Sequence, residues 1–355
     1  MADLTSHSRN FRMPAEWHSH AATQLHWPSN RATWPGKRLQ EVETVYLNVI
    51  EVLSDFEPIH LLVENKEVAD RAERLMDNRG FDTTAITIHL RAINDVWARD
   101  CGPIFVKRIE GEGEAFAITD WEYNAWGGKY PPFGDDNSLP RYFASTYNIP
   151  RFEPGMVLEG GSIDTNGQGL LLTTESVLLN ENRNPELSKR QIEKKLEKYL
   201  GITKIIWLKD GLAGDDTDGH IDDIARFVRE DTILATVTDD PDDINYPALQ
   251  ENLQILKQAA DQHDQKLTIE TLPLPRTKIP STTVDGSEYV PASYVNFYIA
   301  NGVVLVPLYD ERYDQQAVDL LSSYFPDRQV VGISCADLVW GQGSIHCITQ
   351  QLYGI

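Results

Sequence analysis

The chain has 355 residues, of which 41% are hydrophobic and 24% are charged, so it can bury a sizeable core and is not disordered by composition. Its 32 basic and 54 acidic residues give a net charge of −22, which would repel a phosphate backbone and argues against nucleic-acid binding. It has no run of about 18 apolar residues that would predict a membrane span, and residues 1–20 lack the apolar core of a signal peptide.

The predicted elements repeat one order along the chain: strand, strand, helix, strand. A loose first unit has elements at residues 104–108, 115–121 and 139–147. The second has a hairpin over 162–173 that turns at Asn166-Gly167, a helix at 188–200 and a strand at 204–208. The third has strands at 224–228 and 232–237, a helix at 246–263 and a strand at 267–272. The fourth has strands at 294–299 and 303–308, a helix at 315–324 and a strand at 330–333.

This repetition predicts a radially repeated α/β architecture with a site at its central axis. Because no Pro/Gly/Ser-rich linker or low-complexity segment divides the chain, we expect a single domain over residues 1–355. An ordinary open α/β sheet with hairpin insertions is the alternative. Periodicity alone only slightly favours the radial arrangement.

Cys347 is the candidate nucleophile, since a thiolate attacks strongly once a neighbouring base and charge stabilisation are present. We expect His220 to be that base. In a strand it shares a face with Asp222, so that an acid and a base would meet in one pocket. Taken singly, Cys347 also fits a buried inert thiol and His220 a hydrogen-bonded core histidine. His346 would point to the opposite face of a strand, which suits a structural role.

A second interpretation of this region is a metal site. His220 and Asp222 form a His-x-Asp pair, which begins the facial triad of non-haem iron oxygenases. His263 or His346 would then supply the third ligand. The spacing of these histidines is loose, so the thiol interpretation is favoured.

Three carboxylates lie in Gly-rich or apolar surroundings. Asp95, Glu159 and Asp222 would be costly to bring together unless a cation joined them. A planar guanidinium with forked donors satisfies several carboxylates at once. The residues alone therefore indicate a thiol, a base and an acidic cage for a delocalised cation. For Arg99 and Asp100 we expect a structural ion pair.

The segments that carry these residues resemble one known family. Matching blocks occur in order over nearly the whole chain, at residues 12–17, 95–100, 121–128, 159–162, 182–185, 217–223 and 346–351. They resemble the agmatine deiminase and bacterial (Porphyromonas-type) peptidyl-arginine deiminase family, of the guanidino-group-modifying (pentein) superfamily. The resemblance implies a five-bladed pseudo-symmetric α/β propeller built of strand-strand-helix-strand repeats.

By position, the resemblance places the family's catalytic cysteine at Cys347 and its histidine at His220. The guanidinium-binding aspartates fall on Asp95 and Asp222. The glutamate that the family uses beside the histidine and the substrate falls on Glu159. These five residues are the predicted catalytic set, and the three carboxylates are also predicted to bind substrate.

Two further residues of the matching blocks, Trp97 and Asp218, are predicted to contact the substrate. The neighbouring acids Asp215 and Asp216 either help to place a distal amine or are solvated loop charges, and we favour the latter. One departure from the family pattern is Gln342, which separates Gly341 from Gly343 before the cysteine.

The resemblance implies a cofactor-free and metal-free hydrolase of linear amidines that converts agmatine into N-carbamoylputrescine and ammonia, a step of polyamine synthesis. We expect the thiolate to develop mainly once substrate is bound, because nearby carboxylates raise the thiol pKa and a bound cation lowers it. Peptidyl-arginine is the alternative substrate. A non-catalytic binding protein on the same fold is a third reading, which the presence of both the thiol and the histidine disfavours.

The expected partner is a small guanidino cation, whose encounter rate the negative field would raise. No nucleic acid or membrane partner is expected, and a homodimer is left open. Three scattered cysteines, Cys101, Cys335 and Cys347, fit a reducing cytoplasm.

Overall fold

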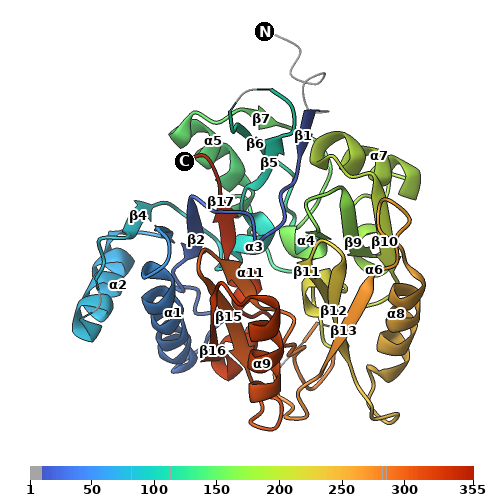
Figure 1. The fold of residues 1–355 in the computed structure, drawn as a ribbon. Helices are drawn as coiled ribbons and strands as arrows, with labels where there is room; N and C mark the ends of the chain where they lie inside the picture. Colours follow the sequence, from blue (N-terminus) through green and yellow to red (C-terminus); the bar gives the residue numbers. More distant parts are fainter. Residues whose placement is uncertain (1–9, 81, 112, 282, 285) are drawn as a thin grey trace.

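The computed structural model describes residues 10–80, 82–111, 113–281, 283–284 and 286–355, whose strands form five sheets (Figure 1). The predicted lack of a signal peptide concerns an N-terminus of which residues 1–9 lie outside this description. No helix within it is long and apolar enough to cross a membrane.

Four of the sheets follow the predicted repeat. In each, an antiparallel strand pair is extended by a parallel strand that the chain reaches through a helix, as a parallel connection requires. The first has β1 Phe11–Arg12, β5 Ile104–Arg108, β6 Phe116–Thr119, α5 Leu139–Tyr147 and β7 Arg151–Phe152. The second has β8 Asp164–Thr165, β9 Leu170–Thr174, α6 Glu175–Leu178, α7 Lys189–Leu200 and β10 Lys204–Leu208.

The remaining two follow in sequence. One has β11 Ala225–Arg229, β12 Thr232–Val237, α8 Tyr246–Gln258 and β13 Thr268–Pro273. The other has β14 Tyr298–Ala300, β15 Val303–Leu308, α9 Asp314–Tyr324 and β16 Gln329–Ser334. Two predicted boundaries are wrong. Helix α8 ends at Gln258 because Ala259 is extended, and β14 starts at Tyr298 because Tyr294 and Val295 form a turn.

The fifth sheet joins the two ends of the chain. It has β17 Gln350–Leu352, β2 Ala22–His26, β3 Ile59–Val63 and β4 Ile86–Leu90, with crossover helices α1 Arg38–Ser54 and α2 Lys66–Arg79. The C-terminal strand pairs antiparallel with β2, placing Gln350 opposite Gln24. The strands of this sheet lie outside the four repeat units predicted from the sequence.

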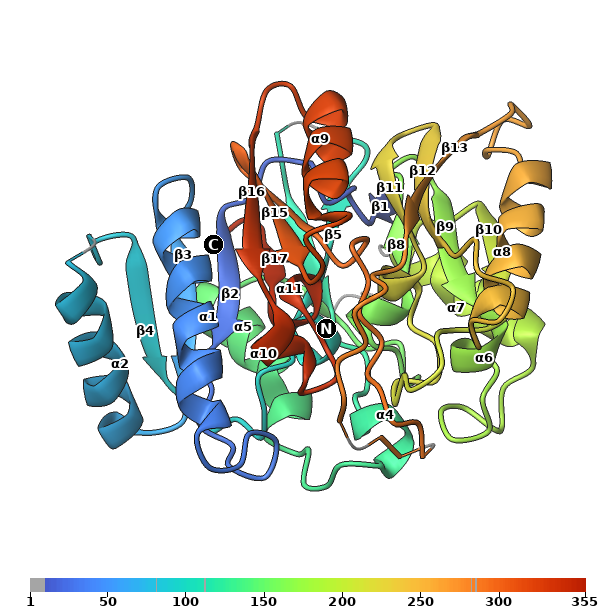
Figure 2. The ribbon, with the colours of Figure 1, turned by 90° about the horizontal axis from the view of Figure 1, so that it is seen from below.

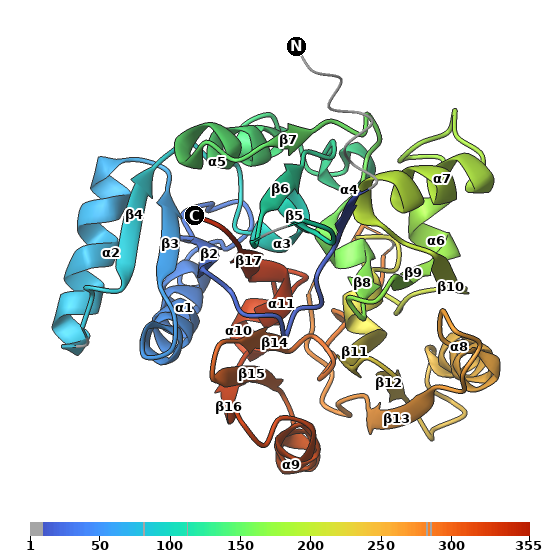
Figure 3. The same cartoon turned by 45° about the horizontal axis from the view of Figure 1, so that its top comes forward.

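The long helices and the short ones occupy different places. Helices α2, α5, α7, α8 and α9 lie at the periphery (Figure 3). The short helices α3 Ala98–Cys101 and α11 Ile345–Ile348 lie near the middle, and α11 is also central when the molecule is seen from below (Figure 2). The segments predicted to carry the chemistry are therefore gathered toward one region.

A pair of buried histidines links the fifth sheet to α5. Nδ1 of His60 on β3 lies 2.8 Å from Nε2 of His89 on β4. The hydroxyls of Tyr147 and Tyr142 on α5 lie 2.9 Å from His60 Nδ1 and 2.8 Å from His89 Nδ1. Burial, followed by the charge of His89, lowers the pKa of His60 from 6.5 to about 4, and burial also lowers the pKa of His89.

We predict that this pair destabilises the protein in acid. The unfolded chain protonates His60 as the pH falls below 6.5, whereas the folded chain resists protonation down to about pH 4, so stability is lost over that window. The free energy of unfolding should fall by about 1–2 kcal/mol for this residue between pH 7 and pH 5. Urea unfolding of His60→Asn should show a smaller loss than wild type, and the exposed control His263→Asn should show the wild-type loss. Equal losses in all three proteins would contradict the assignment.

Candidate active site

A cavity of about 450 Å³ opens beside Cys347 and is lined by Asp95, Trp97 and Asp100. Its walls are rich in aromatic side chains: Tyr123, Trp126, Tyr130, Phe133 and Trp340. Residues of the matching blocks at 95–100, 217–223 and 346–351 line it directly, whereas the block at 159–162, which carries Glu159, packs against α3. A cavity with aromatic walls and a few polar groups is typical of a small-molecule site.

Cys347 lies on α11 and is 7% exposed. Its Sγ lies 3.8 Å from Oδ2 of Asp222. Burial raises the pKa of the Cys347 thiol well above its ordinary value, and the carboxylates of Asp222, Asp223 and Asp100 raise it further. The free protein therefore holds this cysteine as a neutral thiol near pH 7.

His220 is buried against Asp100. Nδ1 of the imidazole lies 3.6 Å from Oδ1 of Asp100, and the His220 backbone N–H donates to Oδ2 of Asp215 at 3.1 Å. Burial alone would lower the His220 pKa, but the surrounding carboxylates, that of Asp100 first among them, outweigh it and raise the pKa above 6.5. His220 is thus prepared to hold a proton that it can deliver.

The two glycines of the Glu159-Gly160-Gly161 block leave room for His220 to lie against Asp100. A Cβ added at Gly161 would lie 2.6 Å from His220 Nδ1 and 2.7 Å from Asp100 Oδ1. A Cβ at Gly160 would lie 2.1 Å from the carbonyl oxygen of Arg99. The Gly161 N–H donates to Asp100 Oδ1 at 3.0 Å. Glycine is therefore required where Glu159 is brought beside the histidine.

Two predictions about local geometry are wrong. His220 and Asp222 do not lie on a strand, because residues Ile221–Asp223 form a 3₁₀ turn. His346 lies in helix α11 and not on a strand, and its ring points to the Asp222 carboxylate. The side chains still gather, since a tight turn directs His220 and Asp222 toward the same glycine, Gly161.

Glu159 is held from behind by Arg183. The Arg183 Nε donates to Glu159 Oε1 at 2.6 Å, and its Nη1 donates to Asp218 Oδ2 at 2.7 Å. Asp218 also pairs with Lys129 at 2.7 Å and does not line the cavity. Asp218 was predicted to contact the substrate. In the structure it binds Arg183, and Arg183 in turn binds Glu159.

Asp95 projects into the other side of the cavity. Its Oδ2 accepts from Asn30 at 3.0 Å and from Thr33 at 2.5 Å, and its Oδ1 accepts from the Val96 N–H at 2.8 Å. Burial raises the pKa of Asp95 to about 6, against the lowering effect of these donors. The ring centroid of Trp97 lies 5.8 Å from that of Trp34, and Trp97 forms part of the cavity wall.

Several buried polar side-chain atoms have no hydrogen-bond partner within the described residues, and three of them belong to the predicted catalytic set: Glu159 Oε2, Asp222 Oδ1 and His220 Nε2. A buried carboxylate oxygen without a donor costs free energy, so such atoms point to a ligand. The two carboxylate oxygens are acceptors that suit guanidinium N–H groups, and the nitrogen of the protonated His220 ring is a donor.

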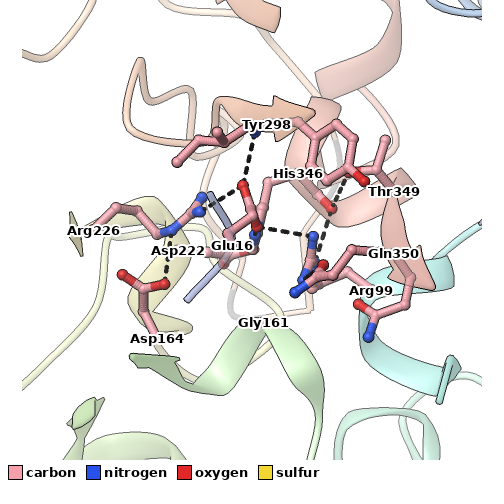
Figure 4. Close-up of polar contacts among 12 residues, drawn as sticks. Glu16, Arg99, Gly161, Asp164, Asp222, Arg226, Tyr298, His346, Thr349 and Gln350 are labelled. Carbon is pink, nitrogen blue, oxygen red and sulfur yellow. Dashed lines mark hydrogen bonds and ion pairs between the residues drawn. The ribbon is translucent and has the colours of Figure 1, made fainter. Parts of the chain in front are cut away.

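An ionic network lies behind this group (Figure 4). Glu16 joins Arg99 at 3.1 Å, Arg226 at 2.9 Å and His346 Nε2 at 2.8 Å. His346 Nδ1 in turn lies 2.7 Å from Asp222 Oδ2. The predicted ion pair between Arg99 and Asp100 is wrong, because Arg99 pairs with Glu16 while Asp100 faces His220.

The iron-site interpretation is not supported. His263 is exposed, and His220, Asp222 and His346 do not place ligand atoms together in the way that a metal needs. The single group with such spacing in the described part of the chain is His26, Cys101 and Asp136. Each of these already contacts backbone atoms: the Asp95 carbonyl, the Trp97 carbonyl, and the Asn94 and Asp95 N–H groups.

Three residues that support the site were not predicted from the sequence: Glu16, Arg183 and Asn296. Asp100 was assigned a different role, that of an ion-pair partner of Arg99. Glu16 and Arg183 lie inside matching blocks, but a pairing between distant segments leaves no local signal. Asn296 is a lone amide in the apolar run of residues 294–300. A buried polar side chain in such a run needs a partner, and that is the signal that could have identified it.

Comparison with known proteins agrees with this geometry. The profile of the Porphyromonas-type peptidyl-arginine deiminase family matches residues 12–352. A curated protein of Legionella pneumophila is 39% identical over 342 residues, which cover 96% of this chain and 94% of that protein.

Two solved structures also match over most of their length. Agmatine deiminase of Enterococcus faecalis is 33% identical, with a TM-score of 0.88 and coverage of 98% of this chain and 97% of its own. A substrate-bound variant of agmatine deiminase from C. jejuni is 29% identical, with a TM-score of 0.84 and coverage of 97% and 96%. The mixed α/β fold is therefore shared, and the chain belongs to the Porphyromonas-type peptidyl-arginine deiminase family.

Proposed function

We propose that the protein is an agmatine deiminase, a hydrolase of the C–N bond of a linear amidine. The observation that carries the proposal is the group of unpartnered buried atoms on Glu159, Asp222 and His220, of which Asp222 also contacts the Cys347 thiol. Agmatine is preferred because the solved relatives of Enterococcus faecalis and C. jejuni are agmatine deiminases. Peptidyl-arginine is the second candidate because the family carries its name.

The guanidinium is held by Asp95 and Asp222, which present its carbon to Cys347. Holding the reacting atoms in place replaces a large part of the entropic barrier. The bound cation offsets the negative charge that raises the thiol pKa, so the thiol releases its proton to the solvent when substrate is present, while His220 stays protonated.

The thiolate forms a C–S bond and gives a tetrahedral adduct. The bond to the terminal nitrogen then breaks as His220 donates its proton, which releases ammonia and leaves an amidino-thioether on Cys347. Neutral His220 next takes a proton from water, and the hydroxide adds to the same carbon. The hydroxyl proton leaves to the solvent as the C–S bond breaks, the thiolate returns, His220 is left protonated for the next cycle, and N-carbamoylputrescine leaves.

We further propose that the five sheets are the blades of a five-bladed pseudo-symmetric α/β propeller, and that residues 1–355 form one catalytic domain. Support comes from the repeated strand order and from the sheet that joins β17 with β2. A cytoplasmic location is supported by the three buried free cysteines. A homodimer stays a prediction.

Agmatine, free arginine and a blocked arginyl peptide distinguish the candidates when ammonia and ureido product are followed in parallel. We expect turnover of agmatine, and a loss of at least about 10³-fold in kcat for Cys347→Ala because the covalent step is gone. Cys335→Ala, a second buried thiol, is the matched control and should keep its activity.

Turnover of the peptide in place of agmatine would keep the mechanism and change the substrate. Near-normal ammonia release by Cys347→Ala would refute the mechanism. No turnover of any of the three compounds by wild type would refute the proposed function.

Asp100→Asn should change the pH dependence of the reaction. Among the charges around His220, the Asp100 carboxylate raises its pKa most. Without this carboxylate the His220 pKa falls, so the imidazolium that protonates the leaving nitrogen is lost at lower pH. The alkaline limb of the kcat profile should move to lower pH. Asp136→Asn, a buried carboxylate of the same cavity that binds backbone N–H groups, should leave this limb in place. An unmoved limb in Asp100→Asn would contradict the role given to Asp100.

A further inference from the structure

Asn296 places a neutral amide against the nucleophile. Its side chain is fully buried, and its Nδ2 lies 3.2 Å from Sγ of Cys347. The second Nδ2 hydrogen points to Oδ1 of Asp223 at 3.0 Å. Asn296 lies just before β14, and so comes from a different part of the chain than any residue predicted to act on the substrate.

The orientation of this amide is fixed. Oδ1 of Asn296 accepts the backbone N–H of His346 at 3.0 Å, which leaves Nδ2 directed toward the sulfur. The His346 ring is itself held between Glu16 and Asp222, at 2.8 and 2.7 Å. A donor that is held in place before reaction stabilises developing charge without reorganisation.

The same amide suits both protonation states of the cysteine. The Cys347 thiol can donate to Asn296 Oδ1 at 3.5 Å, and the thiolate can accept from Nδ2 at 3.2 Å. Hydrogen bonds to a charged group are stronger than neutral ones, so the contact favours the thiolate.

This donor matters because the charged groups that face the thiol oppose its ionisation. The carboxylates of Asp222, Asp223 and Asp100 raise the pKa of Cys347, whereas a backbone hydrogen bond at Ser344 lowers it. Negative charge near a thiol disfavours the thiolate. A neutral donor offsets this effect while adding no positive charge that would repel a cationic substrate.

We propose that Asn296 is a further catalytic residue, whose side-chain amide donates a hydrogen bond to Cys347 Sγ and stabilises the attacking thiolate. The proposal deepens the proposed function and rests on it for the identity of the electrophile. The effect on the thiol itself requires no substrate.

The test is the rate at which iodoacetamide modifies Cys347 in the free protein at about pH 8.5, with the label located by mass spectrometry. We expect Asn296→Ala to react about 10- to 100-fold more slowly than wild type, since each unit of raised thiol pKa removes a factor of ten in thiolate. Agmatine turnover should fall on the order of 10²-fold in kcat. Truncation widens access to the sulfur, which would speed alkylation, so a slower rate reports the lost hydrogen bond.

Two further variants complete the design. Asn296→Asp is nearly isosteric, adds a carboxylate beside the thiol and should react more slowly than wild type even if Asn296→Ala does not fold. Asn252→Ala removes another buried amide, which lies on α8 and bonds the Asp210 carbonyl and the Lys209 N–H just after β10, and it should keep the wild-type rate.

Alkylation of Asn296→Ala and Asn296→Asp at or above the wild-type rate would overturn the proposal. Slower alkylation in a protein whose wild type turns over no guanidino compound would support the hydrogen bond and refute the proposed function. The two failures are thus distinguishable.

Discussion

The site depends on one buried carboxylate, Glu16, which binds Arg99, Arg226 and His346 at once. These partners come from α3, β11 and α11, and Glu16 itself from the N-terminal segment. Burial alone would raise the pKa of Glu16, but Arg226, His346 and Arg99 together hold it well below its ordinary value. Removing one partner of such a network leaves an uncompensated buried charge. The network therefore fixes the segments that carry the nucleophile and the cation-binding acids relative to one another.

That arrangement creates an electrostatic conflict that the reaction uses. Acids gathered for a guanidinium disfavour the thiolate that must attack it. The Asp100 carboxylate faces the His220 ring, and Arg183 donates a hydrogen bond to one oxygen of Glu159. The neutral amide of Asn296 donates to the Cys347 sulfur. In the proposed mechanism, the nucleophilicity of Cys347 then depends on whether the cation is bound.

Local order in the sequence predicted much of this. The helix predicted over 188–200 is α7, which Ser188 begins with a capping box and Gly201 ends in the left-handed conformation. Cys347 and Asp95 line one cavity, together with Asp100, for which a structural ion pair with Arg99 was predicted. The sheet of β17 and β2 could not be predicted, because its strands come from opposite ends of the chain. Nor could the partners of Arg99 or Asn296, since a side chain's neighbours depend on packing between distant segments and not on spacing.

The most direct test of the account is mass spectrometry of the wild-type protein, acid-quenched within one turnover of agmatine. We expect the peptide that contains Cys347 to gain the mass of agmatine less that of ammonia. This adduct should disappear as N-carbamoylputrescine forms. Turnover with no such adduct, or an adduct on a different residue, would contradict it.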